Sequence, residues 1–243
     1  MNIIRHIPNT ITSMNLLCGV LGVIFTLQGR FDLPFYLMLA AAVCDFLDGF
    51  AARMLKAYSA VGKELDSLAD LISFGLLPGI MLYQLMSTFH PGEWVCYVPL
   101  VIVVFSAVRL AKFNVDERQT ENFLGLATPA CAMICGSFTY YTTIPTEGIV
   151  FFNDWVFSAW TIPAAAVILS LLLVSEIPMF SLKFKKGSSY NVIRFSFVIV
   201  ALLAVAAAFI LKTNWSFVIL SIFSLYVIYN ILRYLFTLRV SKK

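Results

Sequence analysis

The sequence has few charged residues. Only 12% of its 243 residues are Asp, Glu, Lys or Arg, whereas a soluble domain has about a quarter, and 60% are hydrophobic. The mean hydropathy of +0.89 excludes an ordinary soluble globular protein. The alternating apolar and polar pattern of a membrane β-strand is also absent. Helices are therefore the only elements with which this sequence is expected to span a bilayer.

Other common features are missing as well. Asn9, Thr12 and Asn15 interrupt the first apolar run and no small-residue cleavage site follows, so we expect no removable signal peptide. None of the five cysteines has zinc-type spacing. Cys131 and Cys135 are one helical turn apart, and with no histidine nearby they are expected to pack in the core. Tandem repeats and low-complexity stretches are absent.

Eight stretches are long and apolar enough to cross a membrane as helices. They cover residues 11–28, 34–55, 66–88, 94–112, 125–144, 155–175, 190–211 and 215–236. The expected fold class is all-α, a polytopic membrane helical bundle of about eight transmembrane helices.

The basic residues indicate the orientation, because Lys and Arg accumulate on the cytoplasmic side of membranes. With the N-terminus inside, only Arg30 and Lys212 of the 17 basic residues fall outside. Both termini are then expected to be cytoplasmic. The basic residues are spread over loops, which suits contact with anionic lipid headgroups and argues against a nucleic-acid partner.

Four aspartates stand out in this apolar sequence. Asp45 and Asp48 are three residues apart near the end of the second span, and Asp66 and Asp70 are four apart at the start of the third. These spacings place each pair on one helix face, so two helices can point four carboxylates at one another. Carboxylates this close repel each other and are costly in lipid unless a cation intervenes. Two divalent cations, Mg²⁺ or Mn²⁺, resolve the conflict, and a metal pair is the usual device for displacement at phosphorus.

The residues between the aspartates suit a phosphate ligand. Gly49 and Ala52 leave room for a phosphate or a neighbouring helix. Arg53 can reach a phosphate oxygen, and Ser59 and Gly62 are expected in a short polar turn beside it. Taken singly, each has an ordinary explanation as a packing glycine, a turn residue or a basic residue flanking the membrane.

The complete pattern from Asp45 to Asp70 reads D-x2-D-G-x2-A-R-x8-G-x3-D-x3-D. It resembles, without a departure, the signature of the CDP-alcohol phosphatidyltransferase family. The resemblance implies a six-helix core within residues 1–175. The basic cytoplasmic loop and the two additional transmembrane helices expected in 176–243 lie outside it. The resemblance also implies a homodimer, two divalent metals, and transfer of a phosphatidyl group from a CDP-activated lipid to an alcohol with release of CMP.

The same resemblance assigns roles to the aspartates. It implies that Asp45, Asp48 and Asp66 ligate metal, and that Asp70 is the catalytic base and also contacts a metal. Residues 8–12, Pro-Asn-Thr-Ile-Thr, look like the family's P-N-x-x-T element, which contacts the nucleotide end of the donor. Without the downstream motif, a plain helix start would explain this stretch equally well. The expected residues that bind the CDP-lipid are Asn9, Thr12, Gly49, Arg53, Ser59 and Gly62.

Three further segments, 106–114, 123–130 and 175–179, resemble the branch of the family that uses serine. Lys112 departs mildly from the Arg usual in that branch. Arg109 offers a planar fork for the serine carboxylate and Asn114 a hydrogen-bonding amide, so the expected acceptor pocket is Arg109, Lys112 and Asn114. The alternative is that Arg109 and Lys112 merely follow the basic bias of the cytoplasmic side.

The expected function is transfer from CDP-diacylglycerol to L-serine, giving phosphatidylserine and CMP, with the active site on the cytoplasmic side of the cell membrane. Another transferase of the family, making phosphatidylglycerol phosphate or phosphatidylinositol, would share every aspartate. A cation transporter also uses intramembrane carboxylates, but outside the motif the spans contain almost no acidic residues.

Overall fold

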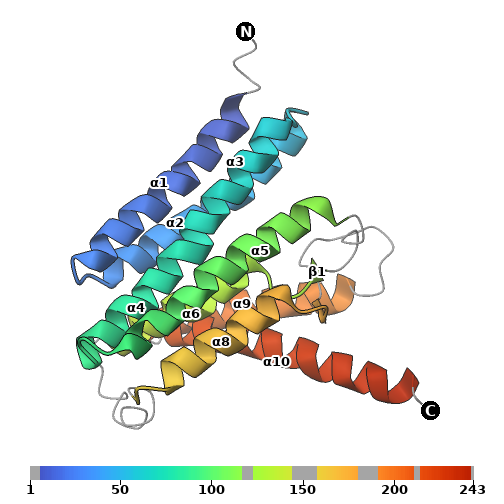
Figure 1. Ribbon diagram of the computed structural model, residues 1–243. Coiled ribbons are helices and arrows are strands. Elements are labelled where there is room, and N and C mark those ends of the chain that lie inside the picture. The colour runs from blue at the N-terminus through green and yellow to red at the C-terminus, as the bar shows by residue number, and fades with distance from the viewer. Residues whose placement is uncertain (1–5, 117–122, 144–157, 180–190, 211–213, 242–243) are drawn as a thin grey trace.

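The chain is almost entirely helical in the computed structural model (Figure 1), which describes residues 6–116, 123–143, 158–179, 191–210 and 214–241. The helices are α1 (Ile7–Leu27), α2 (Asp32–Met54), α3 (Ala60–Asp70), α4 (Leu77–Phe89), α5 (Val101–Val115), α6 (Thr128–Thr143), α8 (Thr161–Val174), α9 (Asn191–Ile210) and α10 (Trp215–Ser241). A π-helical segment, Leu71–Leu76, joins α3 to α4, and a 3₁₀ segment, Trp94–Leu100, leads into α5. The predicted basic loop at 182–189 lies outside the described residues.

Every predicted span corresponds to a helix, and the all-α prediction is confirmed. Five helical stretches are long and apolar enough to cross a membrane, so the protein is an integral membrane protein. They are Ile7–Leu27, Asp32–Met54, Ala60–Phe89, Trp94–Val115 and Trp215–Thr237. The segments Thr161–Val174 and Ile199–Ala208 are shorter apolar helices.

The connection between α2 and α3 corrects the expected polar turn. Lys56 has a φ of 49°, the left-handed conformation that often ends a helix. Ser59 then caps α3, because its Oγ accepts a 2.9 Å hydrogen bond from the backbone N–H of Gly62. Gly62 therefore lies in the first turn of α3 and not in the connection. Because the cap starts the helix at Ala60, Asp66 is already in its second turn.

Helix α1 packs closely against α2, α3 and the π-helical segment. Its buried residues form one stripe along the helix: Pro8, Thr12, Asn15, Gly19, Gly22 and Thr26. A side chain at Gly19 would collide with Ser73, and one at Gly22 with Leu77. The two glycines thus allow α1 to approach the long helix Ala60–Phe89 closely enough for their polar side chains to meet.

The loop before α6 is tied to the end of α8. Strand β1 (Phe123–Leu124) pairs with β2 (Pro178–Met179), and Leu126 donates its N–H to the carbonyl of Leu172 at 2.9 Å. Gly125 has a φ of 78°, and a Cβ there would lie within 2.8 Å of the Ser175 carbonyl oxygen. Glycine is therefore required at this position.

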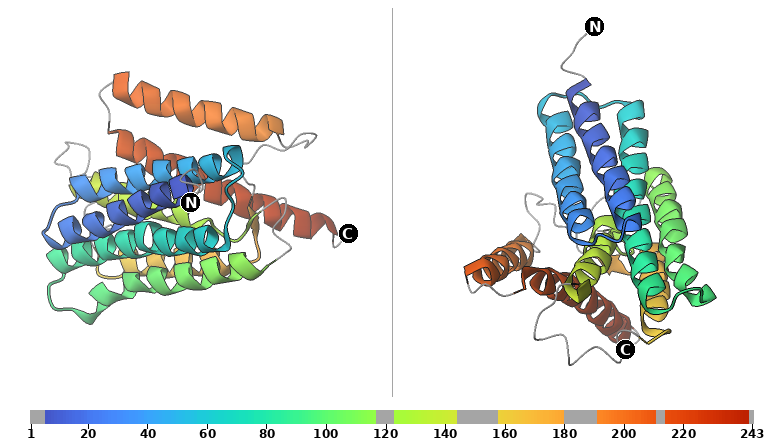
Figure 2. Two further views of the ribbon diagram at one scale, coloured as in Figure 1. Left: turned by 90° about the horizontal axis from the view of Figure 1, so that it is seen from above. Right: turned by 90° about the vertical axis from the view of Figure 1, so that its left-hand side faces the viewer.

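Helices α9 and α10 lie beside one another, with α9 at the edge of the molecule (Figure 2). Helix α10 packs against α6 and contributes Tyr226 and Val227 to the larger hydrophobic core. At its start, Trp215 stacks on Phe35 of α2 with ring centroids 5.3 Å apart, and Phe35 stacks on Tyr140 of α6 at 5.0 Å. These rings attach the C-terminal helix to the rest of the bundle.

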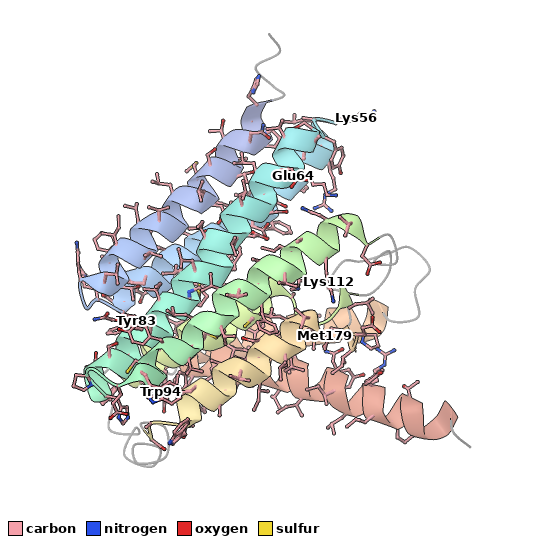
Figure 3. All side chains as sticks on the ribbon, viewed as in Figure 1. Lys56, Glu64, Tyr83, Trp94, Lys112 and Met179 are labelled. Carbon is pink, nitrogen blue, oxygen red and sulfur yellow. The ribbon has the colours of Figure 1, made fainter. Side chains whose placement is uncertain are left out.

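The labelled charged and aromatic side chains lie toward opposite ends of the bundle (Figure 3). Lys56, Glu64 and Lys112 lie toward the end where α3 begins and α5 ends. Tyr83 and Trp94 lie toward the other end, as expected for rings at a membrane interface. The signature aspartates are nearer the charged end, because they follow the start of α3 and precede the end of α2.

Candidate functional site

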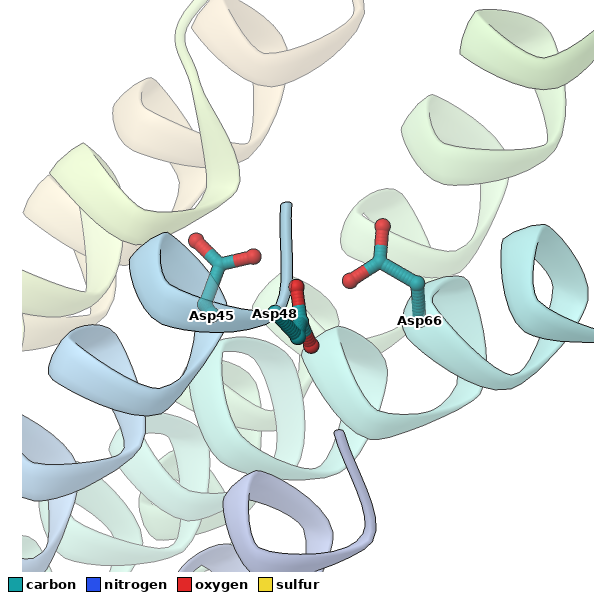
Figure 4. A group of neighbouring side chains, drawn as sticks. All are labelled: Asp45, Asp48 and Asp66. Carbon is teal, nitrogen blue, oxygen red and sulfur yellow. The ribbon is translucent and has the colours of Figure 1, made fainter. Parts of the chain in front are cut away.

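Three carboxylates from two helices converge on one small space (Figure 4). Asp45 and Asp48 project from the C-terminal half of α2 and Asp66 from α3. One oxygen of each lies within 4.8 Å of the others. Asp48 is only 6% exposed, whereas Asp45 and Asp66 are half-buried. The helix spacing and the α2–α3 connection thus bring together residues that are 21 positions apart in the chain.

The fourth aspartate lies beside this group. Asp70 is one turn beyond Asp66 on α3, close enough to Asp45 and Asp66 for their charges to interact. It is bound from α1, where Asn15 Nδ2 donates to Asp70 Oδ1 at 3.4 Å. The structure therefore gathers all four predicted aspartates, with Asp70 set apart from the trio of carboxylates.

The carboxylate trio fits a divalent cation. It offers oxygen donors alone, the ligand type that Mg²⁺ and Mn²⁺ prefer, and the donors are within reach of a shared ion. A residue of a third helix, α1, also holds one member of the trio, since Thr12 Oγ1 donates to Asp48 Oδ2 at 2.6 Å. A hydroxyl bond of this kind fixes the orientation of a ligating carboxylate.

A cavity of about 200 Å³ opens beside the trio and is lined by α1, α2 and α3. Five of the six residues expected to bind the CDP-lipid line it, together with two of the aspartates: Asn9, Thr12, Gly49, Ser59, Gly62, Asp48 and Asp66. Pro8, Ala52, Ala57, Tyr58 and Lys63 complete its wall. We call this space the first cavity.

Arg53 is the expected residue that does not line the first cavity. Its side chain is exposed, and its Nε donates to the carbonyl oxygen of Gly49 at 2.9 Å. This bond holds the guanidinium along its own helix. A ligand in the first cavity would have to draw Arg53 away from Gly49 before the two could meet.

Arg109 lies at a second cavity, of about 240 Å³. Lys112, Asp116, Ser175 and Glu176 also line this cavity, so both signs of charge face it. Val115, Leu124, Leu173 and Val174 supply its apolar wall. The tie between β1 and β2 positions several of these residues, because it joins the segment after α5 to the end of α8.

The Arg109 side chain is buried, with 7% exposed. Its Nη1 donates to Thr128 Oγ1 at 2.8 Å, and its Cζ lies 5.9 Å from the centre of the Phe113 ring. Within the described part of the chain, its Nε has no hydrogen-bond partner. A buried guanidinium held by a neutral hydroxyl and a ring is a strong candidate for an anionic ligand.

Asn114 is placed differently from Arg109 and Lys112. Its Nδ2 donates to Ser67 Oγ at 2.9 Å, and its backbone carbonyl accepts from Lys63 Nζ at the same distance. It does not belong to the lining of the second cavity. In this structure Asn114 joins the end of α5 to α3, between the two cavities.

Three residues at the site were not predicted from the sequence. Asn15 contacts Asp70, Thr128 holds Arg109, and Lys63 lines the first cavity and bonds to Asn114. Asn15 had a signal, because it lies three residues after Thr12 and so shares its helix face. Thr128 lies in the segment 123–130 that resembles the serine-using branch, but nothing in the sequence pairs it with Arg109 on another helix.

Comparison with known families gives one match that covers most of the chain. The model of the CDP-alcohol phosphatidyltransferase family matches residues 5–171. This range contains the four aspartates, and Arg109 and Lys112 of the second cavity. It ends before α9 and α10.

Curated relatives agree with that match. A CDP-diacylglycerol–serine O-phosphatidyltransferase of Mycobacterium leprae (strain TN) is 33% identical over 213 residues, which cover 84% of this chain and 67% of the relative. The Bacillus subtilis (strain 168) protein of the same name is 33% identical over 138 residues, 56% of this chain and 77% of the relative. An archaetidylserine synthase of Methanothermobacter thermautotrophicus is 34% identical over 143 residues, 58% of this chain and 60% of the relative.

Proposed function

The chain belongs to the CDP-alcohol phosphatidyltransferase family, and we propose that it transfers the phosphatidyl group of CDP-diacylglycerol to the hydroxyl of L-serine. The products are phosphatidylserine and CMP. The observation that carries the proposal is the trio Asp45, Asp48 and Asp66 at the edge of a cavity whose other walls contain the expected nucleotide-binding residues. The names of the relatives support serine as the acceptor, including the relative that makes an archaeal lipid.

The cofactors are two divalent cations, Mg²⁺ or Mn²⁺, held by Asp45, Asp48, Asp66 and Asp70. The carboxylate trio supports this assignment by its donor type and spacing. When bound, divalent cations lower the energy of the reaction by neutralising charge on the phosphate oxygens of the donor.

The first cavity binds the CDP end of the donor lipid. Asn9 and Thr12 approach it from α1, and Ser59 and Gly62 from the start of α3. Gly49 gives a phosphate access to the α2 backbone. Arg53 takes a phosphate oxygen in exchange for the Gly49 carbonyl, which keeps its charge close to the cavity until the donor arrives.

Asp70 acts as the general base. It removes the proton from the serine hydroxyl, and the oxygen forms a bond to the phosphorus that carries the diacylglycerol group. The bond from that phosphorus to the CMP oxygen breaks, and CMP leaves with the electron pair. The position of Asp70 beside the trio, bonded to Asn15, supports this role in addition to its contact with a metal.

The second cavity binds serine. Arg109 pairs with the carboxylate of serine, assisted by Lys112, and both line that cavity. The ammonium group of serine needs oxygen acceptors, which the carboxylates of Asp116 and Glu176 provide in the same cavity. Asn114 contributes by joining α5 to α3 through Ser67, and so fixes the distance between the two substrates.

The protein functions in the cytoplasmic membrane, with both termini and the active site on the cytoplasmic side. The basic residues and the charged end of the bundle support this orientation. Residues 1–175 form the catalytic core, and 176–243 add a basic loop and two transmembrane helices. The homodimer implied by the sequence resemblance is also proposed.

The deciding experiment measures CMP release from CDP-diacylglycerol by the purified protein with L-serine, glycerol 3-phosphate or myo-inositol. We expect release with L-serine, dependent on Mg²⁺ or Mn²⁺ and abolished by EDTA. Release with another alcohol alone would assign the protein to another activity of the family. Full turnover after exhaustive chelation would refute the metal assignment.

A further inference from the structure

The polar residues of α1 meet the aspartates in order along the helix. Thr12 contacts Asp48, and Asn15, one turn further, contacts Asp70. Both lie on the buried stripe of α1, whose remaining members are small residues, a proline and Thr26. The Thr26 hydroxyl donates to the carbonyl of Gly22 in its own helix at 2.8 Å, so Thr26 is a polar residue on the same stripe whose hydroxyl bonds within α1.

Asn15 is poorly explained by stability alone. Its side chain is completely buried, and its Nδ2 donates one hydrogen bond, of 3.4 Å, to Asp70 Oδ1. Its Oδ1 has no hydrogen-bond partner among the described residues. Burying a polar atom without a partner is unfavourable, and leucine has a similar size without that disadvantage. An amide at this position therefore indicates a function for its contact with Asp70.

The backbone of Asn15 is also held by a neighbouring element. Ser73 Oγ donates to the Asn15 carbonyl oxygen at 2.9 Å. Ser73 lies in the π-helical segment that begins directly after Asp70, and such wide turns are frequent at functional sites. Gly19 gives Ser73 the space to approach α1. Two bonds, one before and one inside the wide turn, thus fix α1 relative to Asp70.

We propose that Asn15 is a positioning residue for Asp70. It donates to Oδ1 of the carboxylate and so holds Asp70 in the orientation in which it takes the proton of the acceptor hydroxyl. The inference rests on the proposed function, because it needs Asp70 to be the base. It makes α1 part of the machinery for proton removal as well as part of the donor-binding cavity.

The test compares Asn15→Leu with Thr26→Val, a similar polar-to-apolar change on the same stripe. For Asn15→Leu we expect kcat to fall about a hundredfold, the lower range for loss of a positioned general base. The KM for serine and the affinity for CDP-diacylglycerol should change less than about threefold, because Asn15 lines neither cavity. The thermal unfolding midpoint in EDTA should stay equal or rise. Thr26→Val should leave kcat unchanged.

A purely structural role gives a different result. Asn15→Leu would then lower the unfolding midpoint while each folded molecule kept its kcat, and that outcome overturns the proposal. Unchanged kcat with unchanged stability overturns it as well. Asn15→Ala, which creates space but no new contact, is measured in the same way, so that a folding defect of one variant does not decide the matter.

Asp70→Asn separates this inference from the proposed function. If Asp70→Asn abolishes CMP release while Asn15→Leu and Asn15→Ala keep normal kcat, only the role of Asn15 is refuted. If Asp70→Asn itself turns over serine at the normal rate, the assignment of the base is wrong, and the positioning role is refuted with it.

Discussion

The hydroxyl of Thr12 on α1 donates to Oδ2 of Asp48 on α2 at 2.6 Å, a buried contact between residues 36 positions apart. Thr12 also donates toward the carbonyl of Pro8 in its own helix at 3.0 Å, so its hydroxyl is shared between the helix and the carboxylate. The same residue lines the first cavity. Thr12 therefore connects donor binding to the orientation of a proposed metal ligand.

Thr12→Val should weaken the binding of Mn²⁺ by about tenfold, because a ligating carboxylate loses the bond that orients it. The affinity is measured by the electron paramagnetic resonance signal of free Mn²⁺ in a titration. Thr12→Ser keeps the hydroxyl and should bind nearly normally. Thr10→Val, an exposed change on the same helix, is the matched control. Equal affinity in all four proteins would contradict the role of Thr12.

Asn substitutions at Asp45, Asp48 or Asp66 should each lower the rate of CMP release by about 10²–10³-fold, since each removes one charge from the proposed metal cluster. The loss should be partly recovered at high Mn²⁺ concentration if binding, not folding, is impaired. Asp32→Asn is the control, because Asp32 is exposed at the other end of α2 and pairs with Arg30. Normal activity in any of the three Asn variants would remove that residue from the cluster.

Arg109→Ala should raise the KM for serine by about 10- to 100-fold, the range expected when a charged hydrogen bond to a ligand is lost. The KM for CDP-diacylglycerol should change little. Arg109→Lys should recover only part of the loss, because an ammonium group cannot pair with the carboxylate through two N–H groups.

Arg30→Ala serves as the control for Arg109, since Arg30 is exposed and lies far from α5 in the sequence. Steady-state kinetics with each substrate varied in turn provide the measurement. Equal increases in both KM values for Arg109→Ala would remove Arg109 from the acceptor pocket.

Gly125→Ala should destabilise the protein by about 1–3 kcal/mol through backbone strain, with a further loss from the collision of Cβ with the carbonyls of Leu173 and Ser175. Gly29→Ala isolates the strain, because Gly29 has a φ of 79° but no atom within 4 Å of a built Cβ. Thermal unfolding of both variants in detergent measures the difference. If Gly29→Ala were the less stable variant, the collision at Gly125 would be negligible. Only Gly125→Ala should also raise the KM for serine, since its loop carries Leu124 in the second cavity.

The helices and the aspartate cluster could be predicted because both depend on local patterns. Long apolar runs give the helices, and spacings of three and four give the shared faces of Asp45, Asp48, Asp66 and Asp70. The start of α3 was misplaced because Ser59 and Gly62 were interpreted as turn residues by their type. Their mutual hydrogen bond makes them a helix cap instead.

Contacts between distant helices could not be predicted in the same way. Asn114 was expected to face the acceptor, but its amide donates to Ser67 and its backbone carbonyl accepts from Lys63, both on α3. Arg109 was expected at the acceptor site from its position near the end of a span. Its hydrogen bond to Thr128, however, depends on the path of the loop that the pairing of β1 with β2 holds in place. Hydrogen bonds between different helices depend on how the helices pack, and the periodicity of the sequence does not predict them.

The π-helical turn at Leu71–Leu76 divides the long helix Ala60–Phe89 into two halves. The side chains of one half are rotated about the helix axis relative to those of the other. An α-helix advances about 100° per residue, so deleting one residue from this turn would rotate the half with Asp66 and Asp70 by that angle against the half with Leu77 and Met81. The carboxylates would then turn away from α1, or the buried apolar residues away from the core. The extra residue therefore lets one membrane helix direct carboxylates toward α1 in its first half and apolar side chains into the hydrophobic core in its second half.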